Sequence, residues 1–207
     1  MYVPEHFRIE DQNQITALIK DNSFGVLTST DSNGGLIASH LPFMYDPDRG
    51  ENGTLIAHMA RANPHWQEFA GGQETLAVFQ GPHAYISPNH YVSEGQVPTW
   101  NYVAIHAYGR VRIIDDFPAV KKIMNELIET QEATFETPWR YDAPDEVYQK
   151  ITRGIVVFEI PVERFDAKAK LGQNKPLADR QGSIYGLRSE GGENAAAIAD
   201  LTEKVTL

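Results

Sequence analysis

Residues 24–45 read FGVLTSTDSNGGLIASHLPFMY, and this segment predicts a β-hairpin. The two expected strands are Phe24–Thr30 and Leu36–Tyr45. Between them lies DSNGG at residues 31–35, where asparagine and glycine tolerate the positive φ angles that tight hairpin turns need. The segment therefore indicates antiparallel strand pairing early in the chain.

The rest of the chain continues as strands separated by turns or single helices. Four further strands are expected, at residues 54–59, 75–80, 98–114 and 154–161, with a turn-rich stretch at 81–97. Short helices are expected after Asp11, after Asn63, after Asp115 or Asp116 and at residues 144–153, and the tail from Asp166 onward is expected to be helical. No strand–helix–strand rhythm is present, so the predicted class is mainly β: an antiparallel barrel with peripheral helices.

The bulk composition is that of an ordinary globular chain, with 207 residues, 42% hydrophobic and 22% charged. No segment approaches the roughly 20 apolar residues that span a bilayer, and residues 1–7 lack the basic and apolar regions of a signal peptide. The absence of cysteine excludes disulfides and thiolate metal sites. A cytoplasmic protein without a membrane partner is expected.

The formal net charge of −10 disfavours direct binding to DNA, which usually requires a basic face. A local patch can override the net charge, so DNA stays open as a partner. The densest run of cations lies in the tail, where acidic residues interrupt it, at Lys168, Lys170, Lys175, Arg180 and Arg188.

Ser39, His40 and Leu41 form the first segment that could bind a ligand. Strand alternation places Ser39 and Leu41 on one face and His40 on the other. Pro42 cannot donate to a sheet ladder, so an edge or a bulge is expected there, with backbone N–H groups free for a ligand. The alternative is an edge strand with an incidental histidine.

Arg61, Asn63 and Pro64 form the second segment. Asn63 as N-cap and Pro64 at the first helical position predict a helix start, whose N–H groups and partial positive charge suit a phosphate. The planar guanidinium of Arg61 suits bidentate phosphate contact. The alternative is a surface arginine beside a capped helix.

An aromatic row forms the third segment. Along the strand after Pro98, small or apolar residues share one face, and the other face carries Trp100, Tyr102, His106 and Tyr108. Such a row is unusual on a surface that faces water. It indicates a subunit interface, a platform for a flat aromatic ligand, or both if the ligand lies between subunits.

The seven histidines do not predict a metal site. His58 and His65 are too far apart for a compact helical pair, and His83, His90 and His106 show no local ligand spacing. No order of residues typical of a serine hydrolase, phosphate-binding loop or dinucleotide fingerprint is present, so no catalytic residue is assigned. A haem ligand among the histidines stays as a minor alternative.

Six segments together resemble the PaiB-type family of FMN-binding negative transcriptional regulators. In chain order they are MYVPxHF at residues 1–7, SHLP at 39–42, HxARANP at 58–64, GPHAYISP at 81–88, VPTWNY at 97–102 and KLxQN at 170–174. The resemblance implies a split β-barrel related to pyridoxamine-phosphate oxidases, and a homodimer with FMN at its interface. We expect a split-barrel domain over residues 1–166, and a helical extension over 167–207 packed on the same domain. Gly172 stands where the family suggests serine, and Lys175 where arginine is common.

The resemblance and the residue patterns predict one cofactor site. The FMN phosphate is expected near Arg61 and the start of the helix at Asn63, with help from Ser39 and the backbone of residues 39–41. The ring is expected near the other members of the predicted set, with the last three coming from the partner subunit: His40, Leu41, His58, Ala60, Trp100, Asn101 and Tyr102.

Three functions are compatible with such a site. The first is a transcriptional regulator or redox sensor in which FMN reports a state to a DNA or protein partner. The second is an FMN-dependent oxidoreductase acting on a small molecule, in which the cofactor carries the chemistry. The third is a split-barrel protein that binds or degrades haem.

Overall fold

The computed structural model describes residues 1–206 of the chain. The chain forms two compact units, each discontinuous in sequence: unit 1 comprises residues 1–22, 78–106 and those from 165 onward, and unit 2 comprises residues 23–77 and 107–164. Strands β4 (Thr75–Ile86), β5 (Thr99–Gly109) and β7 (Ile155–Lys170) contribute residues to both units. The division expected at residue 166 stays a prediction.

The described strands form one sheet in the order β3-β2-β1-β4-β5-β7-β6. The strands not yet given are β1 (Phe24–Thr30), β2 (Leu36–Asp46), β3 (Thr54–Ala60) and β6 (Arg112–Ile114). β3 also pairs antiparallel with β7, and this additional pairing closes the sheet on itself. The antiparallel split-barrel class predicted from the sequence is therefore confirmed.

The hairpin of β1 and β2 forms as predicted in unit 2. Its register runs from Phe24↔Pro42 to Thr30↔Leu36. The Asp31 carboxylate accepts hydrogen bonds from the backbone N–H groups of Asn33, at 2.8 Å, and Gly35, at 2.7 Å. Gly34 has a φ of +83°, the left-handed conformation that the glycine was expected to supply.

Pro42 lies where β2 changes its pairing partner. Residues up to Pro42 pair with β1, and from Phe43, which lies opposite Ala57, the strand pairs with β3. Because proline has no N–H group, it fits a position where one ladder ends and another begins. The sequence predicts an edge strand or a bulge at this residue, whereas β2 lies between β3 and β1 in the sheet, and Pro42 marks a change of pairing partner.

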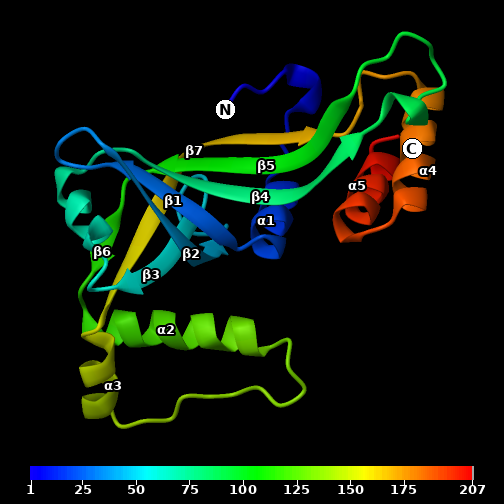
Figure 1. The fold of residues 1–207 in the computed structure, drawn as a ribbon. Helices are drawn as coiled ribbons and strands as arrows, with labels where there is room; N and C mark the ends of the chain where they lie inside the picture. The colour runs from blue at the N-terminus through cyan, green and yellow to red at the C-terminus, as the bar shows by residue number, and fades with distance from the viewer. Residues whose placement is uncertain (207) are drawn as a thin grey trace. The chain divides into compact units, whose positions relative to one another are not determined.

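Two helices accompany the strands of unit 2 (Figure 1). Helix α2 (Phe117–Glu132) begins at Asp116, whose carboxylate accepts a hydrogen bond from Ala119 N at 3.0 Å. Its Val120 and Ile123 side chains pack in one buried cluster with Ile56 of β3 and Val157 of β7. Helix α3 (Asp145–Thr152) follows a long connection, and the short 3-10 helix η2 spans Pro64–Gly71.

Unit 1 contains helices α1 (Gln12–Asp21), α4 (Leu177–Glu190) and α5 (Glu193–Lys204), with 3-10 turns η1 (Glu5–Phe7) and η3 (Pro88–His90). Helices α4 and α5 lie side by side (Figure 1). A Cβ atom at Gly182 would be 2.1 Å from the carbonyl oxygen of His90, so this glycine permits the close approach of α4 to η3. Within residues 1–206, no helix has the length and apolarity needed to cross a bilayer.

Three strand boundaries differ from the sequence prediction. β4 continues to Ile86 instead of ending at Gln80, and a Cβ atom at Gly81 would be 3.2 Å from Val103 Cβ, so the glycine serves close strand packing. The strand after Pro98 ends at Gly109, and residues 112–114 form a separate strand that pairs with β7. The helix expected from Asp166 is wrong over residues 166–170, which extend β7, where Ile9 N donates to Ala167 O at 3.0 Å.

Candidate functional site

The predicted site residues fall into both units. Unit 2 contains residues 39–41, His58, Ala60, Arg61 and Asn63, and unit 1 contains residues 100–102. In each unit, some predicted residues meet one another and some do not.

In unit 2, Ser39 and Asn63 meet at a buried histidine that the sequence did not single out. His65 Nδ1 lies 2.8 Å from Ser39 Oγ, and its Nε2 lies 2.8 Å from Ser29 Oγ. Asn63 closes the network, because its Nδ2 donates to Ser39 Oγ at 3.0 Å and its Oδ1 accepts from His65 N at 3.0 Å. Burial lowers the pKa of His65, against the opposing charge of Glu68, so the neutral imidazole is the favoured form.

Arg61 is exposed, and main-chain carbonyl groups orient its guanidinium. Its Nε donates to Arg153 O at 2.9 Å and its Nη2 donates to Ile155 O at 2.8 Å. The indole N–H of Trp66 donates to Arg61 O at 2.9 Å, and the guanidinium carbon lies 5.5 Å from the centroid of the indole ring. These contacts fix the fork of the arginine and leave its Nη1 amino group available for an anion.

A cavity of about 160 Å³ adjoins this arginine in unit 2. Arg61, Thr152 and Arg153 supply its cationic and hydroxyl groups, and Asp115 supplies an acidic one. Its size suits a phosphate group better than a flavin ring.

The helix start at Asn63 offers fewer free N–H groups than the sequence pattern indicated. Pro64 has no N–H group, and the N–H of His65 is already bound to the Asn63 side chain. The helix is also a 3-10 helix, whose geometry is poorer than that of an α-helix. An anion at this position depends mainly on the Arg61 guanidinium.

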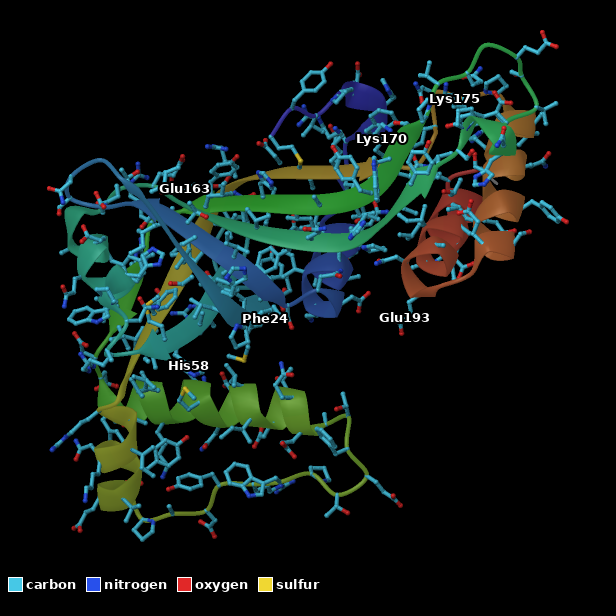
Figure 2. The ribbon with its side chains drawn as sticks, viewed as in Figure 1. Phe24, His58, Glu163, Lys170, Lys175 and Glu193 are labelled. Carbon is cyan, nitrogen blue, oxygen red and sulfur yellow. The ribbon has the colours of Figure 1, made fainter. Side chains whose placement is uncertain are left out.

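The other predicted residues of unit 2 point in different directions. His40 is exposed and stacks near Phe24, with ring centroids 6.3 Å apart, whereas the Leu41 side chain is buried. His58 lies opposite Val157 of β7, on the side of the strands that faces α2 (Figure 2). Its buried Nδ1 has no hydrogen-bond partner among residues 1–206, and burial lowers its pKa. Ala60 is exposed at the end of β3.

Unit 1 presents the aromatic row that the sequence predicted. Trp100, Tyr102 and His106 line a groove of about 400 Å³ on β4 and β5, together with Met1, Val78, Gln80, His83 and Ala104. The Trp100 ring lies 5.7 Å from that of His83 and 6.1 Å from that of Tyr85. Between the row residues, the alternate positions Asn101, Val103 and Ile105 are buried. The groove is therefore a platform with aromatic walls.

Three lysines of unit 1 contact residues 96–102, and two of them, Lys168 and Lys170, contact residues that line this groove. Lys170 Nζ donates to Trp100 O at 2.5 Å and to Thr99 Oγ1 at 2.6 Å. Lys168 Nζ lies 5.1 Å from the centroid of the Tyr102 ring. Lys175 Nζ donates to Gln96 Oε1 at 2.5 Å. We call Lys168, Lys170 and Lys175 the lysine cluster. In the sequence these residues stand out only as a run of cations.

Comparison with known families and proteins shows the family to which the chain belongs. A family model described as "Putative FMN-binding domain" matches residues 1–164. The "Protease synthase and sporulation protein PAI 2" of Bacillus subtilis (strain 168) is 34% identical over 204 residues, which cover 98% of this chain and 97% of that protein. The chain belongs to this FMN-binding family. The resemblance to the PaiB type is confirmed, and FMN is the cofactor of this PaiB-type protein.

A fungal protein is also similar in sequence to the PaiB-type chain, and solved structures share its fold. An uncharacterized protein of Emericella nidulans, AN0679, is 32% identical over 90% of each chain. Among solved structures, the FAD and haem binding protein of Mycobacterium smegmatis superposes with a TM-score of 0.61 at 11% identity, covering 79% of this chain and 73% of that one. The flavocytochrome Anf3 of Azotobacter vinelandii gives 0.60 at 12% identity, covering 81% and 72%. At these identities the structures show the shared fold alone.

The residues of this PaiB-type chain fit FMN in chemical character. An FMN molecule needs a cation for its phosphate and flat apolar walls for its ring. Arg61, oriented by two carbonyl groups, has the character of such a cation in unit 2, and the groove of Trp100 and Tyr102 has the character of such walls in unit 1. Among residues 1–206 there is no group of three histidines or carboxylates that could hold a metal ion.

Proposed function

We propose that this protein is a homodimeric FMN-dependent regulator, in which the state of the flavin controls binding to a partner. The observation that carries the proposal is the similarity to the "Protease synthase and sporulation protein PAI 2" of Bacillus subtilis, which extends over 98% of this chain. Because the similarity runs along both chains, the proposed regulation is placed in the FMN-binding fold itself.

In this proposal the phosphate of FMN binds at the Nη1 amino group of Arg61, beside Ser39 and Asn63. The oriented guanidinium supports this placement, because an arginine whose fork is already fixed loses less entropy on binding. The flavin ring lies near the end of β3, and Trp100, Asn101 and Tyr102 of a second copy cover it. The exposed indole of Trp100, 53% accessible in the single chain, supports a covering role.

The regulatory output follows from the chemistry of the flavin. Reduction changes the charge and the hydrogen-bonding pattern of the ring, and a ring held between two subunits passes that change to the geometry of the dimer. The net charge of −10 favours a protein partner over DNA.

The experiment compares the FMN-loaded protein in the oxidised and the dithionite-reduced state. A mass in solution of twice the 23.2 kDa chain is expected in the oxidised state, with altered hydrogen exchange at residues 99–109 on reduction. DNA gel shifts in both states separate direct binding from action through a protein. A monomer whose exchange is identical in both states contradicts the regulatory proposal.

A second candidate, an FMN-dependent oxidoreductase, is favoured by the open groove beside the aromatic row, which could admit a small substrate. Rapid bleaching of the flavin by NADH or NADPH, followed by turnover with an acceptor, identifies this activity. An intense Soret band in place of a flavin spectrum identifies haem binding.

A further inference from the structure

The lysine cluster concentrates positive charge within unit 1. Lys168 and Lys170 are two residues apart on β7, and Lys175 follows a turn closed by a hydrogen bond from Lys175 N to Gly172 O at 2.8 Å. Lys168 is only 6% exposed, and Lys170 and Lys175 are half-buried. Figure 2 shows Lys170 and Lys175 at the same end of this unit.

The ammonium groups of the cluster have neutral partners. Their acceptors are Tyr2 O for Lys168, Thr99 Oγ1 and Trp100 O for Lys170, and Gln96 Oε1 for Lys175. Within residues 1–206, none of the three lysines forms an ion pair with a carboxylate. The nearby acid Asp179 accepts through Oδ1 from Ser93 N at 2.8 Å and Val92 N at 2.9 Å, and these bonds, with a smaller effect of Lys175, lower its pKa.

Such an arrangement is costly for the folded protein alone. Burial, and then the neighbouring charges of Lys168 and Lys175, lower the pKa of Lys170. Like charges that are partly buried close together destabilise one another unless a nearby opposite charge neutralises them. The folded protein therefore holds three ammonium groups close enough together that one bound anion would stabilise their charged forms.

Two residues that line the aromatic groove, Trp100 and Tyr102, contact lysines of the cluster. The backbone oxygen of Trp100 is bound by Lys170, and the Tyr102 ring lies beside the ammonium of Lys168. The side chains of Trp100 and Tyr102 also line the groove of about 400 Å³. The ammonium groups of Lys168 and Lys170 therefore lie next to two residues of the aromatic wall.

We infer that the lysine cluster and the aromatic groove form a second ligand site, which takes a small planar molecule carrying an oxyanion, either a phosphate ester or a carboxylate. The ammonium groups bind the oxyanion, while Trp100 and Tyr102 pack against the ring. The oxyanion donors of this site are the three lysines, whereas Arg61 is the residue proposed for the FMN phosphate. The inference rests on the proposed function in one respect: the bound ring lies beside the flavin that the same aromatic residues cover.

The test titrates the FMN-loaded protein with phenyl phosphate, benzoate and inorganic phosphate. Calorimetry measures binding, and the visible spectrum of the flavin reports a ring placed beside it. We expect saturable binding of at least one aromatic oxyanion, at least tenfold tighter than inorganic phosphate. The order of phenyl phosphate and benzoate identifies the class of oxyanion.

Variants assign the binding to named residues. Lys170→Gln and Lys175→Gln should each weaken the tighter aromatic ligand about tenfold, and Trp100→Ala should weaken it without changing the affinity for inorganic phosphate. Lys122→Gln, an exposed lysine of α2 in unit 2, is the matched control and should leave every affinity unchanged. Trp100 and Lys175 are accessible enough that at least one of these variants should fold.

Two results would overturn the inference. One is equal affinity for the aromatic oxyanions in the wild type and in the folded lysine variants. The other is displacement of bound FMN by the added oxyanion, measured as free flavin after ultrafiltration. The lysines would then bind the phosphate of FMN itself. If the protein takes up no FMN, the proposed function fails, and the same titration of the flavin-free chain still tests the lysine site.

Discussion

His65 Nδ1 and Ser39 Oγ lie 2.8 Å apart in the buried part of unit 2, and this contact joins the helix after β3 to strand β2. A neutral imidazole has one donor and one acceptor nitrogen, and the hydroxyl groups of Ser29 and Ser39 can satisfy both. Because Ser39 also accepts from Asn63, the histidine fixes the helix start next to Arg61. The position proposed for the FMN phosphate thus depends on a residue that does not touch the phosphate.

The first prediction concerns the stability of this network. His65→Phe keeps the ring volume and leaves the two serine hydroxyls without the imidazole, so we expect a loss of about 2–4 kcal/mol in the free energy of unfolding. Urea denaturation followed by circular dichroism measures it. Gln67→Ala, an exposed position on the same helix, should change the stability by less than about 0.5 kcal/mol. Equal stability of His65→Phe and the wild type contradicts the network's role.

The second prediction is a pH dependence with a defined sign. The pKa of His65 is lowered in the folded state, so the unfolded state binds the proton more readily. The contribution of the neutral histidine is complete above the unfolded value of about 6.5, and it is lost as the pH falls through the lowered folded value. The stability difference between the wild type and His65→Phe should therefore shrink from pH 7.5 to pH 5. A difference that grows over this range has the wrong sign.

The third prediction concerns helix packing in unit 1. Gly182→Ala places a methyl group against the carbonyl oxygen of His90, so α4 and η3 must move apart. We expect a loss of about 1–3 kcal/mol, seen as a lower Tm in thermal unfolding. Gln181→Ala, exposed on the same helix, supplies the control and should keep or raise the Tm, because alanine favours helix. If both variants have the Tm of the wild type, the close approach at Gly182 does not contribute to stability.

The fourth prediction separates the two ends of FMN. Arg61→Ala should weaken FMN about 10–100-fold, the equivalent of one charged hydrogen bond, and leave riboflavin, which lacks the phosphate, unchanged. Fluorescence titration of both flavins measures it. Arg140→Ala, in the exposed segment after α2, should match the wild type. A folded Arg61→Ala protein with undiminished FMN affinity removes the arginine from the site.

The sequence correctly predicted the features that depend on interactions between residues close together in the chain. The turn at residues 31–35 depends only on residues within it. The Asp31 carboxylate accepts from the backbone N–H of Gly35, and Gly34 adopts the positive φ angle. The cap at Asp116 is equally local. The outward row of Trp100, Tyr102 and His106 follows from simple strand alternation.

Contacts between distant segments account for what the sequence did not reveal. Residues 166–170, DAKAK, have the alanine and lysine content of a helix, yet they continue β7, where Arg8 forms an isolated bridge with Lys168 and Ile9 N donates to Ala167 O. Reading them as a helix concealed that Lys168 and Lys170 share one face of a strand. His65 finds its partners 26 and 36 positions away, which no spacing rule detects. Gly172, where serine was expected, has a φ of +82°, a conformation that favours glycine.

The most direct test of the account is a titration of the purified protein with FMN while its mass in solution is recorded. We predict a yellow protein that saturates at one FMN per chain and has twice the mass of the 23.2 kDa chain. A colourless monomer that takes up no added FMN contradicts it.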